Sequence, residues 1–205
     1  MRPVLTIPFN ALVSNARILN ASASAVVAIA LLLTLSGCRS RTANTSESAG
    51  GDENLAVASE LVNEDTNVRI LVPADWELVR GDRRQSADIY ASYPPRDLYA
   101  SVLSEDAAGI SLFTLEDNSE QYRWLIKQEL DRFEGESRTN LSTVDGKRAL
   151  QYEIRGVVNG TSVVYLHTTV EGAQSYYQVV GWTTEARYSE NRDTLRKIIE
   201  SFETS

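Results

Sequence analysis

The chain has 205 residues and a formal net charge of −8, and it is 42% hydrophobic and 23% charged. This composition excludes collagen-like, low-complexity and wholly disordered proteins, and the length suits one domain after an unstructured start. The acidic charge disfavours a nucleic-acid partner, and the single cysteine excludes an internal disulfide or a metal site built on several cysteines.

Residues 1–37 predict a lipoprotein signal peptide. Arg2 and Arg17 give a positive start, and the apolar stretch over 23–35 is shorter than the ~20 residues that span a bilayer. The stretch runs into a sequence that resembles the bacterial lipobox, which consists here of Leu35, Ser36, Gly37 and Cys38. The resemblance implies cleavage before Cys38, a diacylglyceryl group on its thiol and a fatty acid such as palmitate on its amine. A plain secretory leader and an uncleaved anchor are the alternatives.

Residues 38–54 predict a lipidated cysteine followed by a flexible tether. The segment is rich in Ser, Thr, Asn and Gly, a composition that cannot offset the entropy of ordering the chain. Residues 39–54 would reach about 20–24 Å. We therefore expect a protein anchored to the cell envelope through Cys38, because two or more acyl chains anchor stably. Its domain would lie on the periplasmic or another extracytoplasmic side, and the sequence leaves the choice of membrane open.

The folded domain is predicted over 55–205. Its first strand alternates in hydrophobicity and stops at Pro73, and a turn at Pro94-Pro95 separates two later strands. The strands predicted in this half cover 68–72, 87–93, 98–103 and 109–113.

A helix is then predicted from about Asp117 to Gly135. Asp117 is followed three residues later by Glu120, which is the spacing of a capping box, and glycine is typical of a helix end. The residues expected on its buried face are Tyr122, Leu125, Ile126, Leu130 and Phe133.

The C-terminal part predicts three antiparallel strands and a helix. Asn159-Gly160 is typical of a two-residue type I′ hairpin turn. Such a turn places Tyr152 opposite His167 and Ile154 opposite Tyr165. The predicted strands cover 149–158, 161–170 and 174–182, and the closing helix covers 189–202. Leu195, Ile198, Ile199 and Phe202 recur at helical spacing in that helix. The order of elements predicts an α+β fold, an antiparallel sheet flanked by helices.

Four segments in this order resemble the PsbP-like/DcrB-like superfamily over about residues 61–202. They cover 68–76, 144–152, 159–160 and 176–182. The resemblance implies an α/β/α sandwich with a binding or assembly role and supplies no catalytic residues. Photosynthetic relatives attach to photosystem II on the lumenal side, and the cyanobacterial ones are lipoproteins. Val72 stands here where the photosynthetic pattern has a tyrosine before the proline, which disfavours a photosystem partner.

Candidates for catalysis and metal binding are few. His167 is the single histidine and lies in mid-strand, so we interpret it as a sheet residue hydrogen-bonded to its neighbours. The sequence contains no Gly-x-Ser-x-Gly, Walker A or Gly-x-Gly-x-x-Gly motif. Residues 63–67 fit a strand-connecting turn better than a Ca²⁺ site. We expect no enzyme, no cofactor and no resident metal.

The aromatic residues of the domain allow two interpretations, core packing under the helices or a recognition surface. The set comprises Trp76, Tyr152, Tyr165, Tyr176, Tyr177 and Trp182. Tyr165, Tyr176 and Tyr177 are the candidates for a partner surface. The sequence thus predicts a non-catalytic, lipid-anchored envelope protein that binds a partner protein or assists assembly of a membrane complex. The alternatives are a periplasmic lipoprotein that binds a small molecule or cation and, in a photosynthetic source, a photosystem II-associated PsbP-type factor.

Overall fold

The computed structural model describes residues 58–78, 87–106 and 114–204. The strands are β1 (Ala58–Asn63), β2 (Val68–Pro73), β3 (Glu77–Leu78), β4 (Ile89–Tyr93), β5 (Leu98–Asp106), β6 (Arg132–Arg138), β7 (Thr143–Val144), β8 (Lys147–Val158), β9 (Thr161–Glu171), β10 (Ser175–Thr184) and β11 (Glu203–Thr204). The helices are α2 (Leu115–Gln128) and α3 (Tyr188–Glu200), and the short 3₁₀ turns are η3 (Pro94–Arg96) and η5 (Glu185–Arg187).

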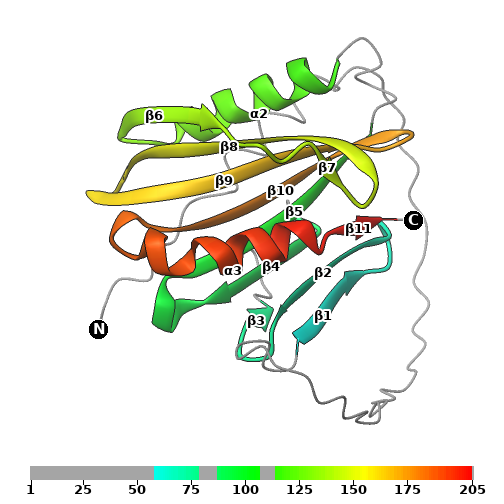
Figure 1. Ribbon diagram of the computed structural model, residues 1–205, viewed down its shortest axis with the longest axis horizontal. Coiled ribbons are helices and arrows are strands. Elements are labelled where there is room, and N and C mark those ends of the chain that lie inside the picture. The colour runs from blue at the N-terminus through cyan, green and yellow to red at the C-terminus, as the bar shows by residue number, and fades with distance from the viewer. Residues whose placement is uncertain (1–57, 79–86, 107–113, 205) are drawn as a thin grey trace, which may run out of the picture.

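A curled antiparallel sheet forms the centre of the fold. Its strand order is β3-β4-β5-β10-β9-β8-β6, and β7 pairs with β8. Figure 1 shows α2 on one side of this sheet, with α3 and the small sheet β1-β2-β11 on the other. The arrangement confirms the predicted α+β class, an antiparallel sheet flanked by helices.

The central strands bury side chains on both faces. In β10, Val179 packs in the core beneath α3, while Val180 and Trp182 pack in the core beneath α2. Gly181 lies between Val180 and Trp182, and a Cβ atom added to it would stand 3.1 Å from the Leu195 side chain. The missing side chain therefore lets α3 approach the sheet closely.

The β8–β9 hairpin forms as predicted. Asn159 and Gly160 have φ angles of 49° and 75°, the positive values that a type I′ turn requires. The register pairs Tyr152 with His167 and Ile154 with Tyr165. A two-residue turn therefore fixes which side chains of these strands point toward α2.

Helix α2 begins and ends earlier than predicted. Its N-cap is Thr114, whose hydroxyl accepts a hydrogen bond from the Asp117 backbone N–H at 3.1 Å, while Asp117 Oδ2 accepts one from the Thr114 N–H at 3.0 Å. The capping box is thus formed by Thr114 and Asp117, and the prediction of Asp117 with Glu120 was wrong. Gly135 lies beyond the helix, in β6.

The apolar periodicity that continued past Gln128 belongs to a turn and an edge strand. The Asp131 N–H donates to the Val157 carbonyl at 2.8 Å and so starts the pairing of β6 with β8. The prediction of Phe133 on a buried helical face was therefore wrong, because this side chain lies on β6 and is 45% exposed. Pairing with β6 gives the backbone groups along this edge of β8 hydrogen-bond partners. They would lack these partners if residues 132–138 continued the helix.

Replacing Thr114 with alanine is expected to lower the free energy of unfolding by about 1 kcal/mol, because the first turn of α2 loses its cap. Urea denaturation followed by circular dichroism measures the change. Thr114→Ser keeps the hydroxyl and is expected to stay close to wild type. Equal losses in the two variants would contradict the role of the cap.

The first and last described elements meet in the small sheet. Its strand β1 was not predicted. Residues 63–67 form the predicted turn between β1 and β2. In this turn Asn63 Oδ1 accepts hydrogen bonds from the backbone N–H groups of Asp65 at 3.0 Å and Thr66 at 3.3 Å. On the other side of β2, β11 pairs antiparallel with residues 68–69. The Thr204 carbonyl accepts from Lys147 Nζ at 3.1 Å, and the Thr204 N–H donates to an Asp145 carboxylate oxygen at 3.1 Å.

Several predictions lie outside the described residues. They are the signal peptide over 1–37, the lipobox, the tether over 38–54, the start of the domain at 55 and the strand over 109–113. Within the described ranges, neither helix has the length and hydrophobicity needed to cross a membrane.

Candidate functional site

The three tyrosines predicted as a partner surface are buried. Tyr165, Tyr176 and Tyr177 are 4%, 8% and 9% exposed. Tyr165 packs beneath α2 with its ring centroid 6.2 Å from that of Trp182, and Tyr177 contacts Phe202 at 5.3 Å on the other face. Their placement corresponds to core packing, because both faces of β9 and β10 are covered. These rings therefore offer little exposed area to a partner.

His167 is fully buried on β9 and hydrogen-bonded, as interpreted from the sequence. Its Nε2 atom lies 2.9 Å from Gln178 Oε1, which also accepts from the Thr169 hydroxyl at 2.9 Å. Because Oε1 is an acceptor, we assign the imidazole proton to Nε2. The ring stacks on Tyr122 of α2 at 5.4 Å, and burial lowers the pKa of His167 to about 4. The imidazole is therefore neutral at pH 7.

The network around His167 joins α2 to the sheet. Gln178 donates through Nε2 to Asn118 Oδ1 at 2.7 Å and to Glu105 Oε2 at 3.3 Å. Asn118 also donates to Glu105 Oε2, at 3.1 Å, and burial raises the pKa of the Glu105 carboxyl. Gln178, Asn118 and Glu105 bond to one another beneath the helix, so their arrangement is that of a structural network, while His167 Nδ1 has no hydrogen-bond partner among the described residues.

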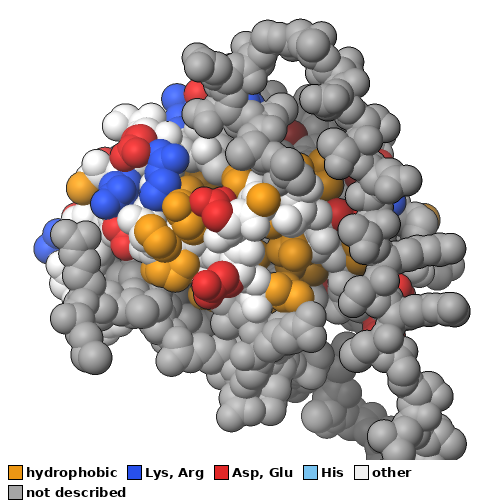
Figure 2. Space-filling view, turned by 90° about the horizontal axis from the view of Figure 1, so that it is seen from below, with side chains coloured by type: hydrophobic (Ala, Val, Ile, Leu, Met, Phe, Trp, Pro, Cys, Tyr) orange, Lys and Arg blue, Asp and Glu red, His pale blue; other side chains and the backbone are white. Residues whose placement is uncertain are grey.

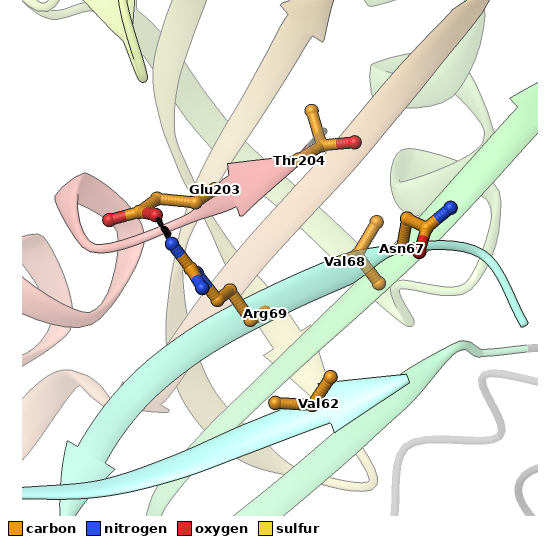
Figure 3. A pocket seen from close by; sticks show the side chains of 6 residues that line it. All are labelled: Val62, Asn67, Val68, Arg69, Glu203 and Thr204. Carbon is orange, nitrogen blue, oxygen red and sulfur yellow. Dashed lines mark hydrogen bonds and ion pairs between the residues drawn. The ribbon is translucent and has the colours of Figure 1, made fainter. Parts of the chain in front are cut away.

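A hollow of about 210 Å³ lies at one end of the small sheet. Figure 3 shows Arg69 on β2 pointing toward Glu203 on β11, and Arg69 Nε lies 2.9 Å from the Glu203 carboxylate. Arg69 Nη1 also lies 3.7 Å from Glu60 on β1. The charged side chains here pair with one another across three strands, which leaves little charge for a ligand.

Hydrophobic surface is scattered on the face drawn in Figure 2. Where the figure colours the surface, hydrophobic side chains form separate groups divided by acidic and uncharged polar ones. Among the described residues, no group of three or more His, Asp or Glu side chains is placed to hold a metal ion. The coloured part of this face therefore presents no single continuous hydrophobic patch.

A larger cleft of about 520 Å³ lies beside α3. It forms because α3 covers the middle of the sheet, while the chain between β6 and β7 follows the edge of β8 irregularly. In that segment the Thr139 N–H donates to the Gln151 carbonyl at 2.9 Å, and the Ser142 carbonyl accepts from the Ala149 N–H at 2.9 Å. One wall is formed by 137–143, the floor by Gln151, Glu153 and Leu166, and the other wall by Arg192, Arg196 and Glu200.

Positive charge stands on the α3 wall of this cleft. Arg192 and Arg196 are four residues apart on α3, which places them on the same side of the helix. Arg196 pairs with Glu200 at 3.6 Å, whereas Arg192 has no acidic partner within 4.0 Å in the described part of the chain. Arg138 pairs with Tyr152 in the strand register, so its side chain projects to the α2 face.

The acidic group on the floor is already engaged. Glu153 accepts from Arg155 Nε at 2.9 Å and from the Tyr188 hydroxyl. The cleft is thus a polar surface on which one arginine, Arg192, has no acidic partner among the described residues, in a chain that is acidic as a whole.

Comparison with known proteins identifies the class of fold. No protein-family model matches the chain, and no curated protein matches its sequence. The solution structure of the cyanobacterial PsbP (CyanoP) from Synechocystis sp. PCC 6803 matches with a TM-score of 0.56 at 16% identity, over 77% of this chain and 98% of that one. The chain therefore has a PsbP-like fold, as the sequence segments predicted.

Two further solved structures resemble the chain more loosely. LpqN, described as involved in cell envelope biogenesis of Mycobacterium tuberculosis, matches at 18% identity and a TM-score of 0.46, over 72% of this chain and 91% of that one. The Ran-binding protein Mog1p of Saccharomyces cerevisiae matches at 11% identity and a TM-score of 0.49, over 72% and 95%.

Proposed function

We propose that this protein is a non-catalytic, lipid-anchored protein of the bacterial envelope, and that its PsbP-like domain binds a partner protein through the cleft beside α3. The observation that carries this proposal is the cleft itself, a concave polar surface of about 520 Å³ on which Arg192 lacks an acidic partner among the described residues. The PsbP-like fold supports a binding or assembly role through the resemblance noted from the sequence.

The placement of the single histidine supports a role without catalysis. His167 is 0% exposed and has a pKa lowered to about 4. A general base has to reach its substrate, directly or through one water molecule. His167 is separated from solvent by α2, so it does not meet this requirement in the described fold.

The anchor is tested by intact-mass measurement of the protein extracted from membranes. We expect a chain that begins at Cys38 and carries the added mass of acyl groups, because residues 35–38 resemble a lipobox. Cys38→Ser is expected to move the protein from the membrane to the soluble fraction, since acyl chains supply the attachment. An unmodified Cys38 behind a retained leader would contradict the anchor.

Partner binding is tested by placing a photo-crosslinking amino acid at Asn140, on the exposed wall of the cleft. In the native host we expect a discrete adduct with another protein, identified by mass spectrometry. The matched control carries the crosslinker at Glu120, exposed on α2 across the sheet. The proposal fails if Asn140 gives no adduct or the same adducts as Glu120. Photosystem subunits in the adduct would place the protein with the PsbP-type factors.

A small-molecule carrier is the second candidate, because the cleft volume of about 520 Å³ lies within the roughly 300–1,000 Å³ of ligand pockets. Such pockets are lined mainly by apolar and aromatic side chains. The walls and floor here are mostly polar, and Leu141 and Leu166 are the hydrophobic residues that line them. The lining therefore favours a protein partner.

A further inference from the structure

We infer that the outer face of the small sheet β1-β2-β11 lies against the lipid bilayer, with Val62 and Leu71 as the side chains that contact it. This inference rests on the lipid anchor of the proposed function and goes beyond it, because it assigns the side of the domain that meets the membrane. The surface is separate from the cleft beside α3.

The small sheet has one buried face and one exposed face. In β2 every second side chain is buried in the core, and those between are exposed. The strand register places Val62 opposite Arg69 and Glu60 opposite Leu71, so these four side chains share the outer face. Val62 and Leu71 are diagonal neighbours there and are 51% and 44% exposed. They form an aliphatic pair that the described fold leaves in contact with solvent.

The charged side chains of the outer face pair with one another. Arg69 Nε lies 2.9 Å from the Glu203 carboxylate, and Arg69 Nη1 lies 3.7 Å from Glu60. The face is therefore close to neutral in a chain whose net charge is −8. Binding of a peripheral protein to a bilayer grows with the apolar area that it buries. We expect this face to contact lipid through its aliphatic pair and not through charge.

The position of the predicted tether selects this face over the rest of the surface. Strand β1 begins at Ala58, which is exposed and lies opposite Pro73. The tether predicted over 38–54 ends four residues earlier, and its reach of about 20–24 Å keeps the start of β1 near the anchored cysteine. Such a tether holds the bilayer at an effective concentration that is roughly millimolar, so a weak apolar contact becomes populated.

The competing hydrophobic surface lies on the α2 side. Trp124 and Phe133 are 54% and 45% exposed, and Lys127 Nζ, one helical turn after Trp124, lies 5.3 Å from the Phe133 ring centroid. Figure 1 shows α2 and the small sheet on opposite sides of the central sheet, in layers that pack about 10 Å apart. To bring α2 to the membrane, the predicted tether would have to pass around the domain. The tether therefore favours the small sheet.

The test places a photo-crosslinking amino acid at Leu71 or at Val62 in the purified lipidated protein, which is reconstituted into phosphatidylcholine vesicles that contain radiolabelled phosphatidylcholine. We expect a phospholipid adduct at both positions, and we expect its yield to stay the same as salt rises because the contact is apolar. The matched control carries the crosslinker at Trp124, which is more exposed but lies on α2. Several-fold less phospholipid adduct is expected there.

Three results would overturn the inference. They are absence of a phospholipid adduct at both Leu71 and Val62, an equal or larger yield at Trp124, and a crosslinked dimer of the protein in place of the phospholipid adduct. A protein adduct at Asn140 in the native host, together with any of these, would leave partner binding standing and remove only the orientation. An unmodified Cys38 in the intact-mass measurement would remove the anchor of the proposed function and this inference with it.

Discussion

Replacing Trp182 with alanine is expected to lower the free energy of unfolding by about 3–5 kcal/mol, the range for removing a large buried aromatic side chain. Trp182 is 1% exposed and lies in the middle of the core beneath α2. Its ring stacks on Tyr99 at 5.4 Å and lies 5.7 Å from Tyr90 and 6.2 Å from Tyr165. Alanine would leave a cavity bordered by three rings that are held in place by separate strands.

Guanidinium denaturation followed by far-ultraviolet circular dichroism measures this loss. Trp124→Ala is the matched control, because Trp124 on α2 is 54% exposed. That variant is expected to change stability by less than about 0.5 kcal/mol, as is usual for surface positions. Similar losses at the two tryptophans would contradict the described core.

Acidification from pH 7 to pH 4.5 is expected to destabilise the wild-type protein through His167. Burial lowers the pKa of this imidazole to about 4 in the folded state, whereas an unfolded histidine titrates near 6.5. Between these two values the unfolded chain binds more protons than the folded one, so stability falls as pH falls. Between pH 7 and pH 4.5 this group is expected to lower the free energy of unfolding by about 2–3 kcal/mol.

The measurement compares urea denaturation of wild type and His167→Gln at several pH values. Glutamine keeps an N–H donor toward Gln178 and cannot titrate, so its stability is expected to fall less on acidification. Burial raises the pKa of Glu105, which acts in the opposite direction and is common to both proteins. Parallel pH profiles for the two proteins would show that His167 does not titrate as described.

Local signals in the sequence were sufficient to predict the structure where they determined both the turn and the strand register. Asn159-Gly160 allowed a two-residue turn, and the pairing of Tyr152 with His167 followed from counting. The closing helix was also predictable, because Leu195, Ile198 and Ile199 repeat at helical spacing and are all buried. In both cases short-range chemistry and the tertiary fold require the same structure.

The sequence was insufficient to predict the structure where strand pairing in the tertiary fold decided between helix and strand. Leu130 and Phe133 continue the apolar spacing of α2, but their segment leaves the helix to pair with β8. The short strands β3, β7 and β11 contain two residues each, so they carry no period of their own. Pairing partners that lie far along the chain determine such strands.

Only one wall of the cleft could be predicted from the sequence. Arg192, Arg196 and Glu200 repeat every four residues on the predicted closing helix, so one polar wall was available from the sequence. The other wall is formed by residues 137–143, a segment that the helix prediction left without an assignment. Only the tertiary path of β6 brings the two walls together.

The small sheet also constrains how the protein reaches its folded state. Arg69 on β2 and Glu203 on β11 are hydrogen-bonded although they lie 134 positions apart in the sequence. Contacts of such long sequence separation form slowly, because a large loop has to close first. During synthesis β1 and β2 therefore lack their C-terminal neighbour β11 until residue 204 has been added. A chaperone would have its longest opportunity to bind in that interval.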